Sequence, residues 1–199
     1  MQLCLLFTAS ICLTALIGDK LVDLFSNLNE LKALADSSTH GLIGVFSWAA
    51  TLSYLRSKRF SLTGNRLLDI GLCGIIASVI DLDHFYAAKS FSLTAATSLD
   101  RRPPLHCTSL WLIVLSLALI SSVVLKAEWL WTLASMIGVA VFSHHIRDAT
   151  RRGIWLWPVG STPPIPYFGY ILLLTILPLV ASYFLPQHAP GGYSEISTV

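Results

Sequence analysis

Charged residues are scarce in this sequence. Only 12% of its 199 residues are Asp, Glu, Lys or Arg, whereas 54% are hydrophobic. Soluble domains are about 25% charged, because their surface has to be solvated. The formal net charge is only +2 and the sequence has no long basic run, so the composition gives no support to nucleic-acid binding. The scarcity of charge argues against a soluble protein and for one whose surface faces lipid.

Paired cysteines and glycosylation motifs are also missing. The four cysteines are Cys4, Cys12, Cys73 and Cys107, and none of them forms a C-x-x-C pair. The first three lie in apolar runs, so we expect no disulfide framework. No N-x-S/T sequence occurs, so nothing indicates a glycosylated lumenal loop. Cysteine usage therefore does not identify the redox compartment.

Apolar runs are what the sequence has in abundance. They cover residues 3–17, 41–55, 67–80, 110–125, 129–143 and 167–185. The last run alone reaches the roughly 18–20 residues that cross a bilayer unaided, and the others need neighbouring polar residues to complete a span. We predict an all-α fold, a multi-pass transmembrane bundle of about six helices with five to six spans. The lipid bilayer is the expected partner of this integral membrane protein.

The predicted bundle forms a single transmembrane helical domain over residues 1–185, followed by a polar, disordered tail over residues 186–199. Two connections are informative. Segment 18–40 carries charged residues among leucines at near-helical spacing, which predicts one amphipathic helix. The K-A-E sequence at 126–128 predicts a tight turn between two helices.

Four short segments contain the residues that could perform chemistry. They are S-T-H-G with His40, D-L-D-H at 81–84, R-R-P-P-L-H-C with His106, and S-H-H-I-R-D at 143–148. Ionisable groups are costly in a bilayer and tend to face an interior or a water-filled cavity. Successive spans alternate in direction, so the first, third and fifth connections lie on one side of the membrane. All four segments fall in or beside those connections, which predicts that they meet at one membrane face.

Residue spacing refines this prediction. His144 and Asp148 are four residues apart and share a helix face, whereas His145 points about 100° away. Asp81 and His84 are three apart and share a face if the preceding helix continues through them, and Asp83 falls off that face. Carboxylate and imidazole ligands together suit zinc, manganese or iron.

Simpler interpretations exist for each segment. His40 at a helix start is typical of a cap or an interface residue. D-L-D-H is also typical of a solvated helix end, and the last segment is compatible with an Arg147–Asp148 surface pair beside two solvated histidines. The four segments taken together favour a shared site more than any one of them does.

The same segments resemble a known family. The sequence A-S-V-I-D-L-D-H-F, then R-R-P-P-L-H-C, then S-H-H-I-R-D-A-T-R-R-G-I-W-L-W-P-V-G is similar to the eukaryotic transmembrane protein 267 family. The order and spacing of these motifs match over residues 10–180. The resemblance implies a membrane protein and assigns no activity.

A more distant resemblance is to the bacterial inner-membrane, LexA-binding family of metal-dependent hydrolases. That family has an early His, an Asp-x-Asp-His segment, a His-Arg-Gly-x-x-His-Ser segment and a late Ser-His…Asp…Thr…Gly…Trp-Pro segment. The matching positions here are His40, Asp81, Asp83, His84, His106, Ser143, His144, Asp148, Thr150, Gly153, Trp157 and Pro158. The first His of the third segment is replaced by Arg101, and a guanidinium does not bind metal, so one ligand of the bacterial pattern is missing.

The resemblance to hydrolases implies a metal site at the mouth of the bundle. Its ligands to a divalent metal such as zinc or manganese would be His40, Asp81, His84, His106, His144 and Asp148. Asp83 would act as a general base or orient a ligating imidazole, and Arg101 or Arg102 would hold an anionic substrate. This hypothesis requires the six ligands to converge, with Asp81 and His144 within about 12 Å of each other.

Two alternatives stay open at this point. In one, the protein is a non-catalytic membrane scaffold or partner-binding protein, and the same residues form a structural or degenerate cluster. In the other, histidine pairs on facing helices bind haem, although the crowding of acids beside them argues against it.

Overall fold

Six long helices account for most of the chain that the computed structural model describes, residues 2–54 and 64–185. They are α1 (Gln2–Leu24), α2 (Asn29–Tyr54), α3 (Gly64–Val79), α6 (Thr108–Val124), α7 (Glu128–Arg152) and α8 (Tyr167–Phe184). Each covers one of the predicted apolar runs except, in four cases, its last residue, so the all-α prediction is confirmed. The predicted tail, 186–199, lies outside the described residues.

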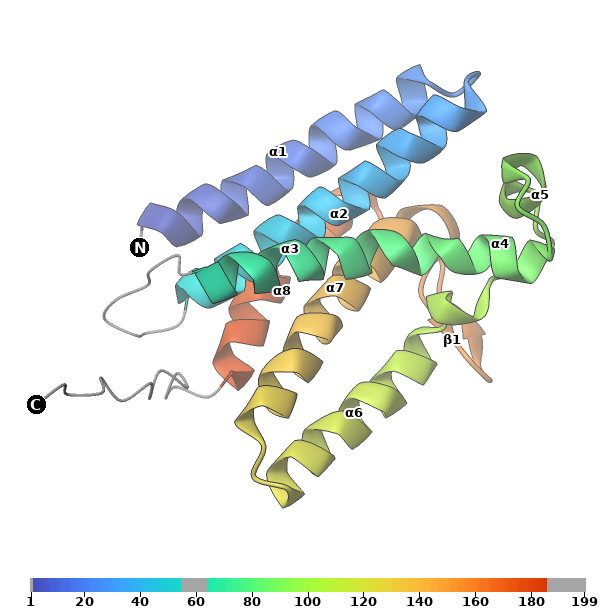
Figure 1. Ribbon diagram of the computed structural model, residues 1–199. Coiled ribbons are helices and arrows are strands. Elements are labelled where there is room, and N and C mark those ends of the chain that lie inside the picture. The colour runs from blue at the N-terminus through green and yellow to red at the C-terminus, as the bar shows by residue number, and fades with distance from the viewer. Residues whose placement is uncertain (1, 55–63, 186–199) are drawn as a thin grey trace, which may run out of the picture.

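Helices α2 and α7 occupy the centre of the bundle. The α1–α2 hairpin packs along one side, α3 contacts both α2 and α7, and α6 and α8 pack on α7 (Figure 1). Trp48 of α2 is fully buried against Cys73 of α3 and Val139 of α7. The large apolar side chains therefore join the three helices that also bring in the candidate site residues.

The outer surfaces of the helices are apolar, as a membrane protein requires. Three helices, α1, α7 and α8, are long and apolar enough to cross a membrane, and α6 is apolar but shorter. Only 22% of the most apolar window of α1, and likewise of α8, is buried inside the protein. Such large exposed apolar surfaces call for lipid around them. The predicted count of five to six spans stays a prediction.

The prediction of one amphipathic helix over segment 18–40 is wrong. Helix α1 continues to Leu24, the chain turns, and α2 begins at Asn29. The turn is closed by the backbone hydrogen bond from Leu28 N–H to Phe25 O, 2.8 Å. Ser and Asn at positions 26, 27 and 29 favour such turns, because their side chains compete for backbone hydrogen bonds. The leucines that suggested one helix are divided between the end of α1 and the start of α2, and all five of them, Leu21, Leu24, Leu28, Leu31 and Leu34, are exposed.

Two connections at one end of the bundle have structure of their own. Between α3 and α6 the chain forms η1 (Ile80–Leu82), α4 (Asp83–Ala88), α5 (Leu93–Thr97) and η2 (Pro104–His106). Between α7 and α8 the strands β1 (Trp155–Leu156) and β2 (Gly160–Ser161) pair antiparallel. An isolated bridge between Cys107 and Trp155 ties the two connections together. The predicted turn at 126–128 is confirmed, since α6 ends at Val124 and α7 begins at Glu128.

Close packing of α2 and α3 depends on Gly74. A Cβ atom at this position would lie 2.5 Å from Cγ2 of Val45 and 2.8 Å from the backbone oxygen of Gly41. We expect Gly74→Ala to lower the free energy of unfolding by about 1–3 kcal/mol, because overpacking forces backbone shifts. Thermal unfolding in detergent measures the effect.

Gly71, one turn earlier in the same helix, is the matched control. A Cβ there meets no atom within 4 Å, so Gly71→Ala should be neutral or slightly stabilising, because alanine is the better helix former. Equal melting temperatures for the two variants would show that the α2–α3 contact tolerates separation.

Candidate metal centre

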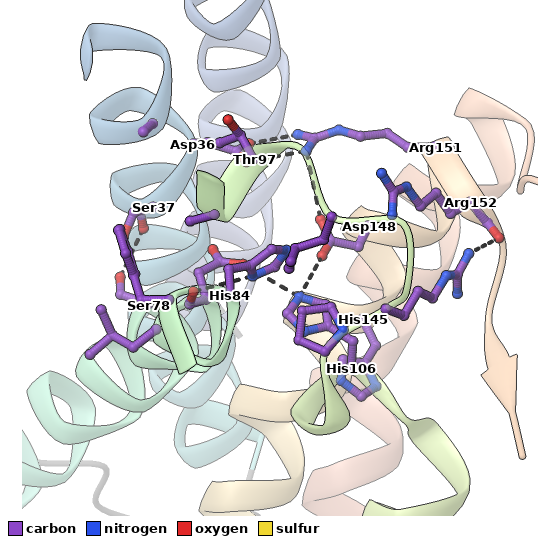
Figure 2. A pocket seen from close by; sticks show the side chains of 18 of the residues that line it. Asp36, Ser37, Ser78, His84, Thr97, His106, His145, Asp148, Arg151 and Arg152 are labelled. Carbon is purple, nitrogen blue, oxygen red and sulfur yellow. Dashed lines mark hydrogen bonds and ion pairs between the residues drawn. The ribbon is translucent and has the colours of Figure 1, made fainter. Parts of the chain in front are cut away.

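The four candidate segments meet at one end of the bundle, as predicted. Asp81 comes from η1, His106 from η2, and His144 and Asp148 from one face of α7. One ligand atom from each of these four residues lies within 4.8 Å of all the others. Figure 2 shows the side chains of His84, His106 and Asp148 directed into the same cavity.

Five of the six distances between the four ligand atoms are nearly equal, and the sixth, between the Asp81 and Asp148 oxygens, is within 4.8 Å. Nε2 of His106 lies 3.4 Å from Oδ1 of Asp81 and 3.3 Å from Oδ2 of Asp148. Nε2 of His144 lies 3.5 Å from the same Asp81 oxygen and 3.3 Å from the same Asp148 oxygen. The two imidazole Nε2 atoms are 3.2 Å apart. Asp81 and His144 are therefore much closer to each other than the limit of about 12 Å that a shared metal site requires.

These distances fit a tetrahedral metal site. Zinc binds imidazole nitrogen and carboxylate oxygen at about 2.0–2.2 Å, and a regular tetrahedron with bonds of about 2.0–2.1 Å has edges of about 3.3–3.4 Å. Charge-assisted hydrogen bonds between nitrogen and a carboxylate are shorter, about 2.7–2.9 Å. The spacing therefore suits four atoms around a common cation better than a hydrogen-bonded cluster.

The ring nitrogens that face away from the cluster have partners. Nδ1 of His144 lies 2.8 Å from the carbonyl oxygen of Ala77 in α3. Nδ1 of His106 lies 3.4 Å from Oδ2 of Asp83, which also accepts the N–H of Leu105 at 2.7 Å. Metal-binding histidines characteristically donate their second ring N–H to a carbonyl or a carboxylate, which fixes the ring and its tautomer. Both imidazoles thus present Nε2 to the cluster.

In the connection between α3 and α6, neighbouring side chains stabilise the charged forms of Asp81, Asp83 and His106. Burial disfavours the charged form of Asp83, but hydrogen bonds from His106 and His84 lower its pKa to about 2. Burial likewise opposes the charge on His106, yet three carboxylates, first that of Asp148, raise its pKa to about 11. The pKa of Asp81 is lowered despite its burial, chiefly by the hydrogen bond from His106. Without metal, the carboxylates are thus balanced by a protonated His106.

His40 and His84 lie beside the four-residue cluster and outside it. His40 is buried within α2, not at a helix start, and its ring stacks on that of His144 with centroids 3.8 Å apart. Its Nε2 lies 3.4 Å from Oδ1 of Asp148. Nδ1 of His84 lies 3.8 Å from Asp81 Oδ1 and 3.3 Å from Asp83 Oδ1. If α3 continued through this segment, Asp83 would fall off the face that Asp81 and His84 share. Instead the chain tightens into η1 before α4, and Asp83 faces the histidines.

His145 points away from the cluster, as its spacing predicted. Its Nδ1 is 2.9 Å from Oγ1 of Thr108 and its Nε2 is 3.0 Å from the carbonyl oxygen of Leu105. Both nitrogens therefore bind the segment that carries His106. His145 positions η2 against α7 and has no nitrogen left for a ligand.

The cavity at the cluster has a volume of about 570 Å³ (Figure 2). Basic side chains also reach its wall, since Lys32, Arg102, Arg151 and Arg152 line it together with Asp81, His106 and Asp148. Arg102 donates to the carbonyl oxygens of Gly153 and Arg152. Arg101 is exposed and does not line this cavity.

A buried ion-pair network behind the site was missed by the sequence analysis. The guanidinium of Arg147 is 1% exposed and binds Asp36 Oδ1 at 2.6 Å and Asp19 Oδ1 at 3.1 Å. Arg151 binds the same Asp36 carboxylate at 2.6 Å. The Arg147–Asp148 surface pair considered above is therefore wrong, because neighbouring residues on α7 point to different sides. The charges in segment 18–40 were the available signal, since a helix hairpin places them beside α7.

The fold and the cluster together define a helical membrane protein with a His/Asp centre at one end of its bundle. Comparison with known proteins is consistent with this class. The chain is 42% identical to transmembrane protein 267 of Xenopus laevis over 157 residues, 78% of this chain and 69% of that protein. It is 38% identical to the Mus musculus protein of the same name over 174 residues, 85% of this chain and 77% of that protein. The chain belongs to the transmembrane protein 267 family. No family model matches it, and no solved structure does.

Proposed function

We propose that the four-residue cluster binds a divalent metal ion such as zinc or manganese. The observation that carries this proposal is that five of the six distances between the ligand atoms of Asp81, His106, His144 and Asp148 are 3.2–3.5 Å, and the sixth, between the two carboxylate oxygens, is within 4.8 Å. The contacts of Ala77 with His144 and of Asp83 with His106 support it. In metal sites, the ring nitrogen that does not bind the metal almost always donates a hydrogen bond of this kind. The site would be held by the connection between α3 and α6, which supplies Asp81 and His106, and by α7, which supplies His144 and Asp148.

We infer further that the protein is a membrane-bound hydrolase, in line with the motif resemblance to bacterial metal-dependent hydrolases. A bound divalent ion polarises a phosphoryl or carbonyl oxygen and lowers the pKa of a bound water to about 7. Asp83 would keep His106 oriented, because its carboxylate contacts Nδ1 of that ring. Arg102 would hold an anionic group of the substrate. Arg101 lies outside the cavity, and we assign it no role.

A second candidate function is non-catalytic. Four protein ligands in a tetrahedron are typical of structural metal sites, whereas catalytic zinc sites usually keep one position open. In that case the ion fastens the α3–α6 connection to α7 and the function lies in binding a partner. Metal content is the same for both candidates, so turnover separates them.

The test uses the full chain purified in detergent, wild type beside the Asp81→Ala/His144→Ala double variant. We expect the wild type to carry at least one equivalent of zinc or manganese and the double variant to lose it, because two of four ligands are gone. Hydrolysis of phosphate-ester and carboxylate-ester substrates is then measured with and without metal. Metal-dependent turnover that the double variant lacks supports the hydrolase. Metal without turnover supports the structural candidate, and equal metal content in both proteins contradicts the site.

A further inference from the structure

The imidazole of His106 faces two groups of ligands at once. Its Nε2 belongs to the four-residue cluster, whereas its Nδ1 lies 3.3 Å from Oδ1 of Asp83. Nδ1 of His84 lies 3.3 Å from the same oxygen. One ligand atom each from Asp83, His84 and His106 falls within 4.8 Å of the others. These spacings equal those of the first cluster, so this second group has the dimensions of a metal site as well.

Asp83 supplies an independent observation that points to a cation. Its side chain is 4% exposed, and its Oδ2 is occupied by the N–H of Leu105. Its Oδ1 is buried and points between the two Nδ1 atoms, which contact it at 3.3 Å, but neither contact has the geometry of a hydrogen bond. Such contacts satisfy a buried carboxylate oxygen incompletely, which is costly, and native structures rarely leave such an atom without a well-formed partner. A cation at this position would satisfy it.

We propose a second divalent-cation site formed by Asp83 Oδ1, His84 Nδ1 and His106 Nδ1, with the His106 imidazole bridging the two ions. This inference rests on the proposed function of the first cluster. The first site has four protein ligands, and the second has three. Three protein ligands and an open position are the usual arrangement of catalytic zinc. His84 is 28% exposed and lines the cavity with His106, so the open position faces the cavity.

The two sites would therefore have different functions. The first fastens the α3–α6 connection to α7 and holds His106 in place. The second presents its open position to an anionic substrate that enters along the basic wall formed by Lys32, Arg102, Arg151 and Arg152. In this arrangement the first site is structural, the second is catalytic, and the two form one centre.

Occupation of the second site displaces two contacts. With one ion bound, Nδ1 of His106 carries a proton that it donates to Asp83, and the second ion replaces this proton, which is released to solvent. His84 gives up the contact of its Nδ1 with the carbonyl oxygen of Asp81, which is 3.2 Å long. That distance is at the weak end of the range for such hydrogen bonds, so replacing this contact of His84 by a bond to the ion is favourable.

Zinc stoichiometry tests the proposal directly. Metal-free full-length protein in detergent is titrated with zinc, and bound metal is measured after dialysis. We expect two equivalents for the wild type, with release of a proton on binding of the second. A wild type that saturates at one equivalent overturns the second site, whatever the variants do, and leaves the first site standing if His144→Ala removes that equivalent. A wild type that binds no zinc contradicts both sites.

Variants assign each equivalent to its site. His84→Ala and the isosteric Asp83→Asn should each bind one equivalent, with the dissociation constant of the second ion raised by at least about 100-fold. His106→Ala should lose both ions. His145→Ala is the matched control, because this neighbouring histidine also lines the cavity but has both nitrogens bonded elsewhere, and it should keep two. Two equivalents in both His84→Ala and Asp83→Asn would place the second ion elsewhere and overturn the proposal.

Discussion

Replacing His144 by alanine should weaken zinc binding at the first site by about 100- to 1,000-fold. Zinc contributes about 10–16 kcal/mol in structural sites with four ligands, so one ligand of four accounts for about 2.5–4 kcal/mol, and each 1.4 kcal/mol is a factor of ten. Competition with a chelator of known affinity measures the change. The replacement also removes the ring on which His40 stacks, so folding is monitored in parallel by size-exclusion chromatography.

His145→Ala provides the comparison for this result. The two histidines are adjacent in α7 and both are buried, but only His144 directs a nitrogen at the cluster. We expect the control to lose stability through its contacts with Thr108 and Leu105 and to keep its affinity for zinc within about tenfold, since it acts only through the position of η2. If both variants lost affinity equally, the ligand assignment on α7 would be wrong.

Replacing Arg147 by alanine should lower the free energy of unfolding by about 3 kcal/mol. Removal of one partner from a buried ion pair typically costs about 3–5 kcal/mol, because the remaining charge is left buried and uncompensated. Asp19 and Asp36 are 25% and 23% exposed, so water screens part of the loss and the lower end of the range applies. Denaturation in mixed detergent, or thermal unfolding, measures the difference.

Two further variants test whether the loss of charge pairing causes the instability expected for Arg147→Ala. Arg152→Ala removes an exposed arginine from the same helix and should change stability by less than about 0.5 kcal/mol. Combining Arg147→Met with Asp19→Asn and Asp36→Asn should recover part of the loss, because no buried charge is left unpaired; Arg151 also loses Asp36, but it is 47% exposed and stays solvated. A triple variant as unstable as Arg147→Ala would mean that packing, and not charge, makes Arg147 necessary.

The sequence could predict which polar residues gather at one end of the bundle, but it could not predict which of them contact one another. Each segment stands out because carboxylates and imidazoles are rare among apolar runs, and span alternation places all of them at one end. The sequence could not show that Asp83 faces His106, since that requires the tight η1 turn between α3 and α4. It also could not show that Arg101 is exposed while Arg102 reaches Gly153, because proline-rich connections follow no periodic pattern.

What the sequence determined by itself is local: six apolar helices, a membrane environment, and a common face for His144 and Asp148. These features depend on composition and on the 3.6-residue repeat, which act within one helix. The tertiary structure decided which groups from different helices meet. Close approach of α2 and α3 at Gly74 and the orientation of α7 set the contact between His144 and Ala77, the partners of Arg147, and the position of His106 between two sets of ligands. Such contacts depend on how several helices pack at once, and no single segment of the sequence contains that information.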